Sequence, residues 1–146
     1  MFERYTEKAR RVIFFARYEA TQFGLPYVET EHLLLGLLRE NPALTSVVLP
    51  SGGSIDAIRK QIEERTTPRE KTSTSVDLPL SNESKRVLAY AAEEAERFGH
   101  KLIGSEHLLL GLLSEKGALA AHLLNSRGLS LDRGREIVSK GLNTPG

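Results

Sequence analysis

Two glutamate–histidine pairs are the residues of this sequence best suited to chemistry. Glu31 precedes His32, and Glu106 precedes His107. A carboxylate beside an imidazole occurs in general acid–base catalysis and in metal binding. An enzyme of this kind needs a deep pocket that shifts the pKa of the carboxylate, and a metal site needs about three or four converging ligands. Because the pairs lie in separate halves of the chain, we expect structural histidines at helix starts, no catalytic residues, no cofactor and no metal.

Both pairs belong to a nine-residue stretch that occurs twice. Its copies begin at Thr30 and Ser105 and differ only by that Thr-to-Ser change. The hydroxyl residue is suited to cap a helix, and leucines on nearly every face predict a helix that is buried on most sides. Gly36 and Gly111 interrupt the leucines. A mid-helix glycine costs about 1 kcal/mol relative to alanine, so we expect another backbone to pack closely against each one.

The two stretches are part of a longer repeat with an offset of 75 residues. Thr6 and Ser81 each precede an apolar stripe with helical spacing, and Gly24 and Gly99 follow its end. The matching apolar positions are Val12, Ile13, Ala16, Ala20 and Phe23 in the first half, and Val87, Leu88, Ala91, Ala95 and Phe98 in the second.

This pattern predicts an all-α fold made of two tandem, pseudo-symmetric four-helix repeats, eight helices in all. In the first half we expect helices from Thr6 to Phe23, from Thr30 to about Glu40, from Pro42 to Val48, and from Ser54 onward, with a stop over 50–53. The first repeat is predicted over 1–65, a mobile linker over 66–79, and the second repeat over 80–146. Together they form one compact domain.

Composition excludes several classes of function. The chain has 146 residues, 20 Lys and Arg against 19 Asp and Glu, and no basic run, which argues against nucleic acid as the main partner. Cysteine is absent, and local spacing assembles no Ser-His-Asp arrangement, so there is no candidate nucleophile. No signal peptide and no apolar run of roughly 20 residues is present. We therefore expect a cytoplasmic protein with no membrane partner.

The repeat resembles the Clp N-terminal domain, which fronts the ClpA and ClpC unfoldases. The opening residues 1–6, the Phe23-Gly24 helix end and both Glu-His-Leu-Leu-Leu-Gly-Leu segments are most similar to the ClpC branch. The resemblance implies a non-catalytic module, monomeric as an isolated domain, that binds substrate proteins and adaptor proteins for a hexameric ATPase. No G-x-x-x-x-G-K-[ST] motif is present. The chain is therefore either an excised domain or a free-standing helical regulator that competes for Clp adaptors or substrates.

The resemblance also implies a ligand. Some ClpC-like domains bind phosphoarginine, and the matching positions here are Thr6 with Glu31, and Ser81 with Glu106. A carboxylate suits the guanidinium group, while a hydroxyl and the N–H groups of a helix start suit the phosphoryl group. The alternative is simple helix capping, because a hydroxyl followed by glutamate is also typical of a stable helix start.

The sequence departs from the ClpC pattern at two places near these residues. Asn82 and Glu83 stand where a proline and a basic residue are common, so Glu83 would bring a like charge near an incoming phosphate. Glu29 stands where the family usually has glycine, as the second half does at Gly104.

Three apolar residues precede the predicted caps: Phe2, Tyr5 and Leu80. They could be hydrophobic staples that fix the helix starts. They could also form an exposed apolar seam between the halves, where partner proteins dock.

Overall fold

The computed structural model describes residues 2–48, 54–66, 70 and 77–141. The predicted stop over 50–53 lies outside the described residues, and so does most of the predicted linker over 66–79. The described helices are α1 (Glu7–Phe23), α2 (Thr30–Glu40), α3 (Ala43–Val48), α4 (Ile55–Glu64), α5 (Asn82–Arg97), α6 (Ser105–Ser114), α7 (Leu119–Ser126) and α8 (Leu131–Ser139). The all-α prediction with two sets of four helices is confirmed over this part of the chain.

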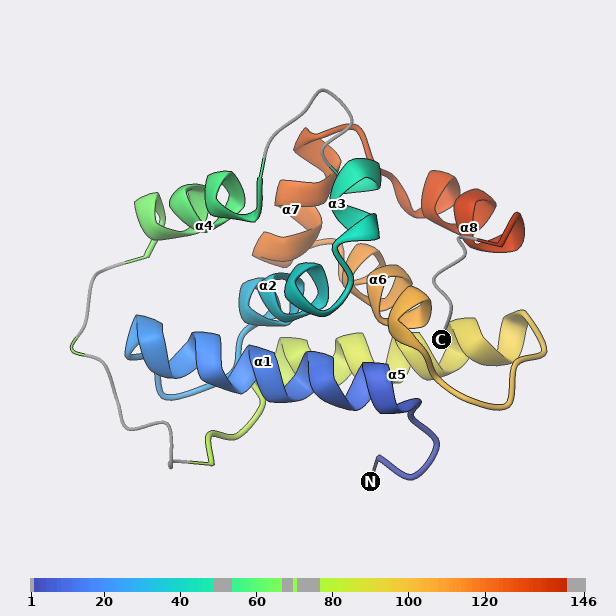
Figure 1. The fold of residues 1–146 in the computed structure, drawn as a ribbon, viewed down its shortest axis with the longest axis horizontal. Coiled ribbons are helices and arrows are strands. Elements are labelled where there is room, and N and C mark those ends of the chain that lie inside the picture. Colours follow the sequence, from blue (N-terminus) through green and yellow to red (C-terminus); the bar gives the residue numbers. More distant parts are fainter. Residues whose placement is uncertain (1, 49–53, 67–69, 71–76, 142–146) are drawn as a thin grey trace.

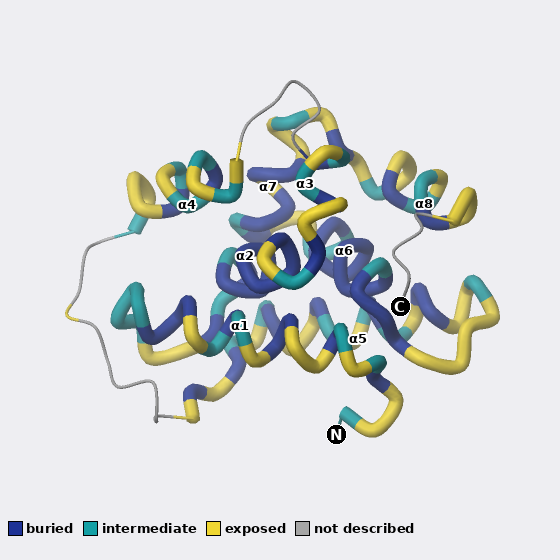
Figure 2. The backbone as a smooth tube through the Cα atoms, in the orientation of Figure 1, coloured by how far each residue is buried: buried dark blue, intermediate teal, exposed yellow. Residues whose placement is uncertain are grey.

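The leucine-rich helices α2 and α6 lie at the centre of the molecule. Figure 1 shows α1 and α5 along one side of this pair, and α3, α4, α7 and α8 on the other side. Both central helices are buried over most of their length, whereas Arg39 in the last turn of α2 is exposed (Figure 2). Leucines on all faces of α2 and α6 therefore find apolar neighbours in every direction, as the sequence predicted.

The outer helices α1 and α5 begin and end with the signals that the sequence provides. The Thr6 hydroxyl accepts a hydrogen bond from the Ala9 N–H at 3.1 Å, and the Ser81 hydroxyl accepts one from the Ser84 N–H at 3.1 Å. Gly24 follows α1 with a φ of 70°, a left-handed conformation that glycine adopts without strain. The predicted caps at Thr6 and Ser81 are confirmed.

The central helices are capped differently, and the prediction that Thr30 and Ser105 cap them is wrong. Both are the first residues inside their helices, after extended N-cap residues Glu29 and Gly104. The cap is instead a histidine at the third helical position, whose Nδ1 accepts the N–H of the N-cap residue. His32 accepts from Glu29 at 2.9 Å, and the same bond in α6 measures 2.8 Å. An imidazole here takes the place of the Glu or Gln of a capping box.

Gly36 and Gly111 mark the points where two helix backbones meet. A Cβ atom on Gly36 would lie 2.5 Å from the Val12 carbonyl oxygen and 2.9 Å from the Ala16 nitrogen of α1. In the second half, a Cβ on Gly111 would clash in the same way with the carbonyl of Val87 on α5. Any side chain would separate the helices, so the predicted close backbone contact is confirmed.

The two halves exchange short extended segments before their first helices. Tyr5 pairs with Ile103, and Leu80 pairs with Val28, in two isolated parallel bridges. In the first bridge the Thr6 N–H donates to the Ile103 carbonyl at 3.0 Å, and in the second the Ser81 N–H donates to the Val28 carbonyl at 3.0 Å. The start of α1 is thus attached to the start of α6, and the start of α5 to the start of α2.

Buried glutamates attach the last helix of each half to its first helix. Glu19 of α1 pairs with Arg59 of α4 at 2.7 Å, and Glu94 of α5 pairs with Arg135 of α8 through bonds of 2.9 and 2.8 Å. The guanidinium group of Arg135 lowers the pKa of Glu94. These pairs satisfy charges that would otherwise be costly to bury.

We expect Gly36→Ala to destabilise the fold. Alanine favours a helix by about 1 kcal/mol over glycine, but overpacking against the α1 backbone costs typically 1–3 kcal/mol. The free energy of unfolding, measured by urea denaturation, should therefore fall. Gly117→Ala is the control, because a Cβ at Gly117 meets nothing within 4 Å. Equal stability of the two variants would contradict the close contact.

We also expect His32 to make the fold less stable at acid pH. Burial lowers the pKa of His32 from 6.5 to about 4. Between these values the unfolded chain binds a proton that the folded chain does not, so the free energy of unfolding falls as pH is lowered through this window. At pH 5 the loss is on the order of 2 kcal/mol.

Urea denaturation at pH 7 and pH 5 checks this contribution. His32→Gln keeps a side-chain acceptor for the N-cap N–H but does not titrate, so its stability should depend less on pH than that of the native sequence. His122→Gln, at an exposed position, is the matched control for the loss of a histidine side chain. The assigned role of His32 as a cap would be refuted if the free energy of unfolding of His32→Gln depended on pH as strongly as that of the native sequence.

Candidate functional site

In the structure each predicted ligand hydroxyl lies near the glutamate of the opposite half. The predicted pairing of Thr6 with Glu31, and of Ser81 with Glu106, is therefore wrong. Thr6 lies at the start of α1, whereas Glu31 follows the far end of that 17-residue helix, a rise of about 25 Å. The bridge between Tyr5 and Ile103 brings Thr6 to the start of α6, where Glu106 lies. We call this the α1/α6 junction. By the second bridge, Ser81 joins Glu31 at the α5/α2 junction.

Glu106 is a partly buried carboxylate that forms no ion pair with a lysine or arginine in the described part of the chain, although His100 partly offsets the effect of burial on its pKa. Its side chain is 26% exposed, and burial raises its pKa. One carboxylate oxygen lies 3.3 Å from Nδ1 of His107. That nitrogen accepts the Gly104 N–H and therefore carries no proton, so the contact is not an ion pair. Burial also lowers the pKa of His107 to about 4, which keeps its ring neutral.

The absence of a side chain at Gly104 determines where the Glu106 carboxylate lies. A Cβ on Gly104 would clash with an oxygen of that carboxylate, so the side chain folds back against the N-cap backbone. At the α5/α2 junction, Glu29 is the equivalent of Gly104 and carries a side chain at this point. The two junctions therefore cannot place their glutamates in the same way.

Glu31 is half-buried and surrounded by negative charge. Burial is the main cause of its raised pKa, and the nearby carboxylates of Glu29 and Glu83 raise it further. Among the described residues no lysine or arginine forms an ion pair with Glu31; its closest polar contact is the Thr30 hydroxyl at 3.5 Å. The α5/α2 junction is therefore the more acidic of the two.

The hydroxyl groups of Thr6 and Ser81 also differ in the hydrogen bonds that they form. Ser81 donates to the Ser84 hydroxyl at 3.0 Å, and Ser84 in turn donates to the Val28 carbonyl at 2.8 Å. The Thr6 hydroxyl accepts the Ala9 N–H, and no described residue accepts the proton of that hydroxyl. Thr6 can therefore donate to a ligand oxygen without breaking a bond within the domain.

The apolar residues before the caps are less exposed than a docking seam requires. Tyr5 is 7% exposed and Leu80 is 9% exposed, and both are part of the core. The positions that a staple would contact are the charged Arg10 and Lys85, so the staple interpretation is wrong. Pairing with the opposite half buries both residues instead. Phe2 is half-buried, and its ring packs edge-on against Tyr5 at 5.0 Å.

Sequence reasoning missed two exposed apolar residues next to the junctions. Tyr27 is 47% exposed and Leu102 is 51% exposed, and they occupy equivalent positions just before the bridge residues Val28 and Ile103. Their signal was available in the sequence, because both are large apolar residues between turn residues and a buried β-branched position.

Both histidines use Nδ1 to accept a backbone N–H and are almost completely buried. This is the structural role that the sequence predicted for them. Within the described ranges, no cluster of three or more His, Asp or Glu side chains is arranged to hold a metal ion. None of the helices in this part of the chain has the length and hydropathy to cross a membrane.

Comparison with known proteins identifies the family. The Clp repeat (R) N-terminal domain matches residues 4–137. Over 129 residues, 88% of this chain, the sequence is 44% identical to the chloroplastic chaperone protein ClpC1 of Oryza sativa subsp. japonica, and this match spans 14% of that relative's length. The cytoplasmic location expected from the sequence is therefore not one that this relative shares.

Solved structures share the fold. The N-terminal domain of the chaperone ClpD from Arabidopsis thaliana matches with a TM-score of 0.79 and 32% identity, covering 98% of this chain and 100% of that chain. A ClpV N-domain in complex with a VipB peptide matches with a TM-score of 0.72 and 17% identity, covering 94% of this chain and 86% of that chain. These matches, together with the internal repeat and the eight described helices, show that the chain belongs to the Clp repeat N-terminal domain family.

Proposed function

We infer that this domain is a protein-recognition module of a Clp-type unfolding and degradation machine, and that it binds substrate and adaptor proteins without chemistry of its own. Family membership supports this function, and so does the peptide bound to the structurally similar ClpV N-domain. The histidines that could have served catalysis are engaged as helix caps. A cytoplasmic location remains a prediction from the sequence.

The α1/α6 junction is the proposed site for phosphoarginine on marked substrates. The observation that carries this proposal is the Glu106 carboxylate, which is partly buried, has a raised pKa and forms no ion pair with a lysine or arginine among the described residues. A guanidinium group would supply that ion pair through charge-assisted hydrogen bonds. The Thr6 hydroxyl and the positive end of α1 suit the phosphoryl group.

The α5/α2 junction is proposed to bind phosphoarginine weakly. Glu29 and Glu83 belong to different halves, yet both act on Glu31. Two added carboxylates would repel a phosphoryl group, and the Ser81 hydroxyl already donates to Ser84. Because of the crosswise pairing, both departures from the ClpC pattern fall at one junction, and the other junction has neither.

Phe2 and Leu102 are proposed to hold the polypeptide that carries the modified arginine. Phe2 keeps accessible surface beside Tyr5, and Leu102 is exposed next to Ile103, so both lie at the α1/α6 junction. Apolar contacts there would favour a marked protein over the free amino acid.

Calorimetric titration with phosphoarginine, arginine and phosphate tests the site. We expect saturable binding of about one phosphoarginine per chain, with the other two ligands much weaker. Glu106→Gln should weaken phosphoarginine binding roughly tenfold or more, since it removes a charge-assisted pair. Exposed Glu93→Gln is the matched control and should bind normally. Equal weak binding of all three ligands, or full affinity in Glu106→Gln, would remove the phosphoarginine proposal but not adaptor binding.

The double variant Glu29→Gly, Glu83→Lys tests the asymmetry of the junctions. It removes both carboxylates that raise the pKa of Glu31 and gives the α5/α2 junction a glycine and a cation near the start of α5. We expect the calorimetric stoichiometry to rise from about one to about two phosphoarginines per chain. If it stays at one while the variant remains folded, the two carboxylates are not what disables this junction.

A further inference from the structure

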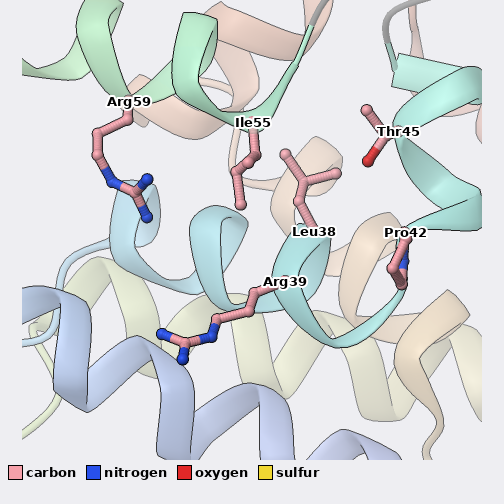
Figure 3. A pocket seen from close by; sticks show the side chains of 6 residues that line it. All are labelled: Leu38, Arg39, Pro42, Thr45, Ile55 and Arg59. Atoms are coloured by element: carbon pink, nitrogen blue, oxygen red, sulfur yellow. The ribbon is translucent and has the colours of Figure 1, made fainter.

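A cleft lies on the first half of the domain, on the side of α2 that faces α4. Its volume is about 440 Å³, and it is lined by Leu38, Arg39, Pro42, Thr45, Ile55 and Arg59. Figure 3 shows Arg59 extending from α4 and Arg39 extending along α2 toward α1, while Ile55 and Leu38 approach each other to the right of Arg59 and above Arg39. We call this the arginine cleft. None of its residues belongs to the α1/α6 or α5/α2 junction.

The two arginines of the cleft are in different electrostatic states. Arg59 is paired with Glu19 at 2.7 Å and with Asp56 at 3.1 Å, so its charge is compensated. Arg39 forms no ion pair or hydrogen bond with any described residue. Its guanidinium carbon instead lies 4.6 Å from the ring centre of Phe15 and 5.3 Å from that of Tyr18. The cleft therefore contains one uncompensated positive charge.

Stacking leaves Arg39 ready to bind a carboxylate. Contact with aromatic rings occupies a face of the guanidinium plane, whereas its N–H donors point outward within that plane. The rings also restrict the long side chain, so less conformational freedom is lost when a ligand binds. A carboxylate can receive two parallel hydrogen bonds from such a group.

The surface around Arg39 is suited to a polypeptide. Tyr18 is 40% exposed, and the neighbouring Phe14 is 68% exposed, so α1 presents aromatic surface beside the cleft. Within the cleft the half-buried Ile55 provides an apolar wall, next to Leu38, which is almost fully buried. Exposed apolar surface next to an unpaired charge is typical of protein-binding sites.

The second half provides an internal comparison. An equivalent cleft of about 440 Å³ is lined by Leu113, Lys116, Asn125, Ser130, Leu131 and Asp132. The residue in place of Arg39 is Ser114, whose hydroxyl donates to the Leu110 carbonyl at 2.8 Å. Exposed Glu93 stands in place of Tyr18. This cleft has a similar volume, but its cation, Lys116, makes no cation–π contact with a described ring, and its lining includes the carboxylate of Asp132.

We propose that the arginine cleft docks an acidic peptide segment of a partner protein, one that carries a carboxylate next to an apolar side chain. The carboxylate binds Arg39, and the apolar side chain packs against Leu38 and Ile55. Glu93 and the absence of a stacked cation disfavour the same segment at the equivalent cleft of the second half. The proposal depends on the proposed function only in taking the domain to bind polypeptides.

Titration of the ¹⁵N-labelled chain followed by NMR tests the proposal. The probe is the peptide acetyl-Gly-Glu-Leu-Leu-Glu-Gly-amide, with versions in which Lys replaces Glu or Ser replaces Leu. We expect the acidic, apolar peptide to give saturable shifts in α1, α2 and α4, and both altered peptides to bind much more weakly. Arg39→Glu should weaken binding roughly tenfold or more because it reverses the charge. Tyr90→Ala, at the position equivalent to Phe15, is the matched control and should bind as the native sequence does.

Several results would overturn the proposal. They are equal shifts at both clefts, equal binding of the lysine peptide, unchanged affinity in Arg39→Glu, or no saturable shift at millimolar peptide. Dispersed amide spectra confirm that each variant is folded. The probe contains no phosphoarginine. A separate titration of the same samples with phosphoarginine measures binding at the α1/α6 junction. Failure at the arginine cleft is thereby distinguished from failure of the proposed function.

Discussion

The close contact between helix backbones at Gly36 and Gly111 is the constraint on which the rest of the structure depends. It lets α1 approach α2, and α5 approach α6, so closely that the central leucines are enclosed on all sides. Interiors are packed as densely as organic crystals, so a side chain at either glycine would move a whole helix. The same contact holds in place the helices whose starts carry Thr6 and Ser81.

The junctions are shared between halves, and this decides their chemistry. Each combines a hydroxyl from one repeat with a glutamate from the other, through the bridges at Ile103 and Val28. Each repeat therefore contributes to both junctions, and one junction can combine changes that arose in different repeats. The acidic α5/α2 junction illustrates this, because Glu29 comes from the first half and Glu83 from the second, and both raise the pKa of Glu31.

Much of the fold could be predicted from the sequence, because its signals are local. The caps at Thr6 and Ser81, the stop at Gly24 and the glycine contacts follow from residue type and spacing. The crosswise pairing could not be predicted, since an offset of 75 residues does not tell which half an extended segment will join. Thr30 resembles a cap, but it is the first residue inside α2. The N-cap residue is Glu29, because His32 accepts the Glu29 N–H. The stacking of Arg39 on α1 is equally non-local.

The exchange of bridges has a consequence for assembly. Two separate copies of one half could form both bridges only as a two-fold symmetric dimer in which each copy pairs with the other, an arrangement like domain swapping. Joining the halves in one polypeptide replaces that bimolecular encounter with an intramolecular one, so the pairing no longer depends on protein concentration. Covalent linkage also frees the copies from symmetry. One repeat can acquire a stacked arginine and the other a serine at the same position, which no dimer of identical chains could do.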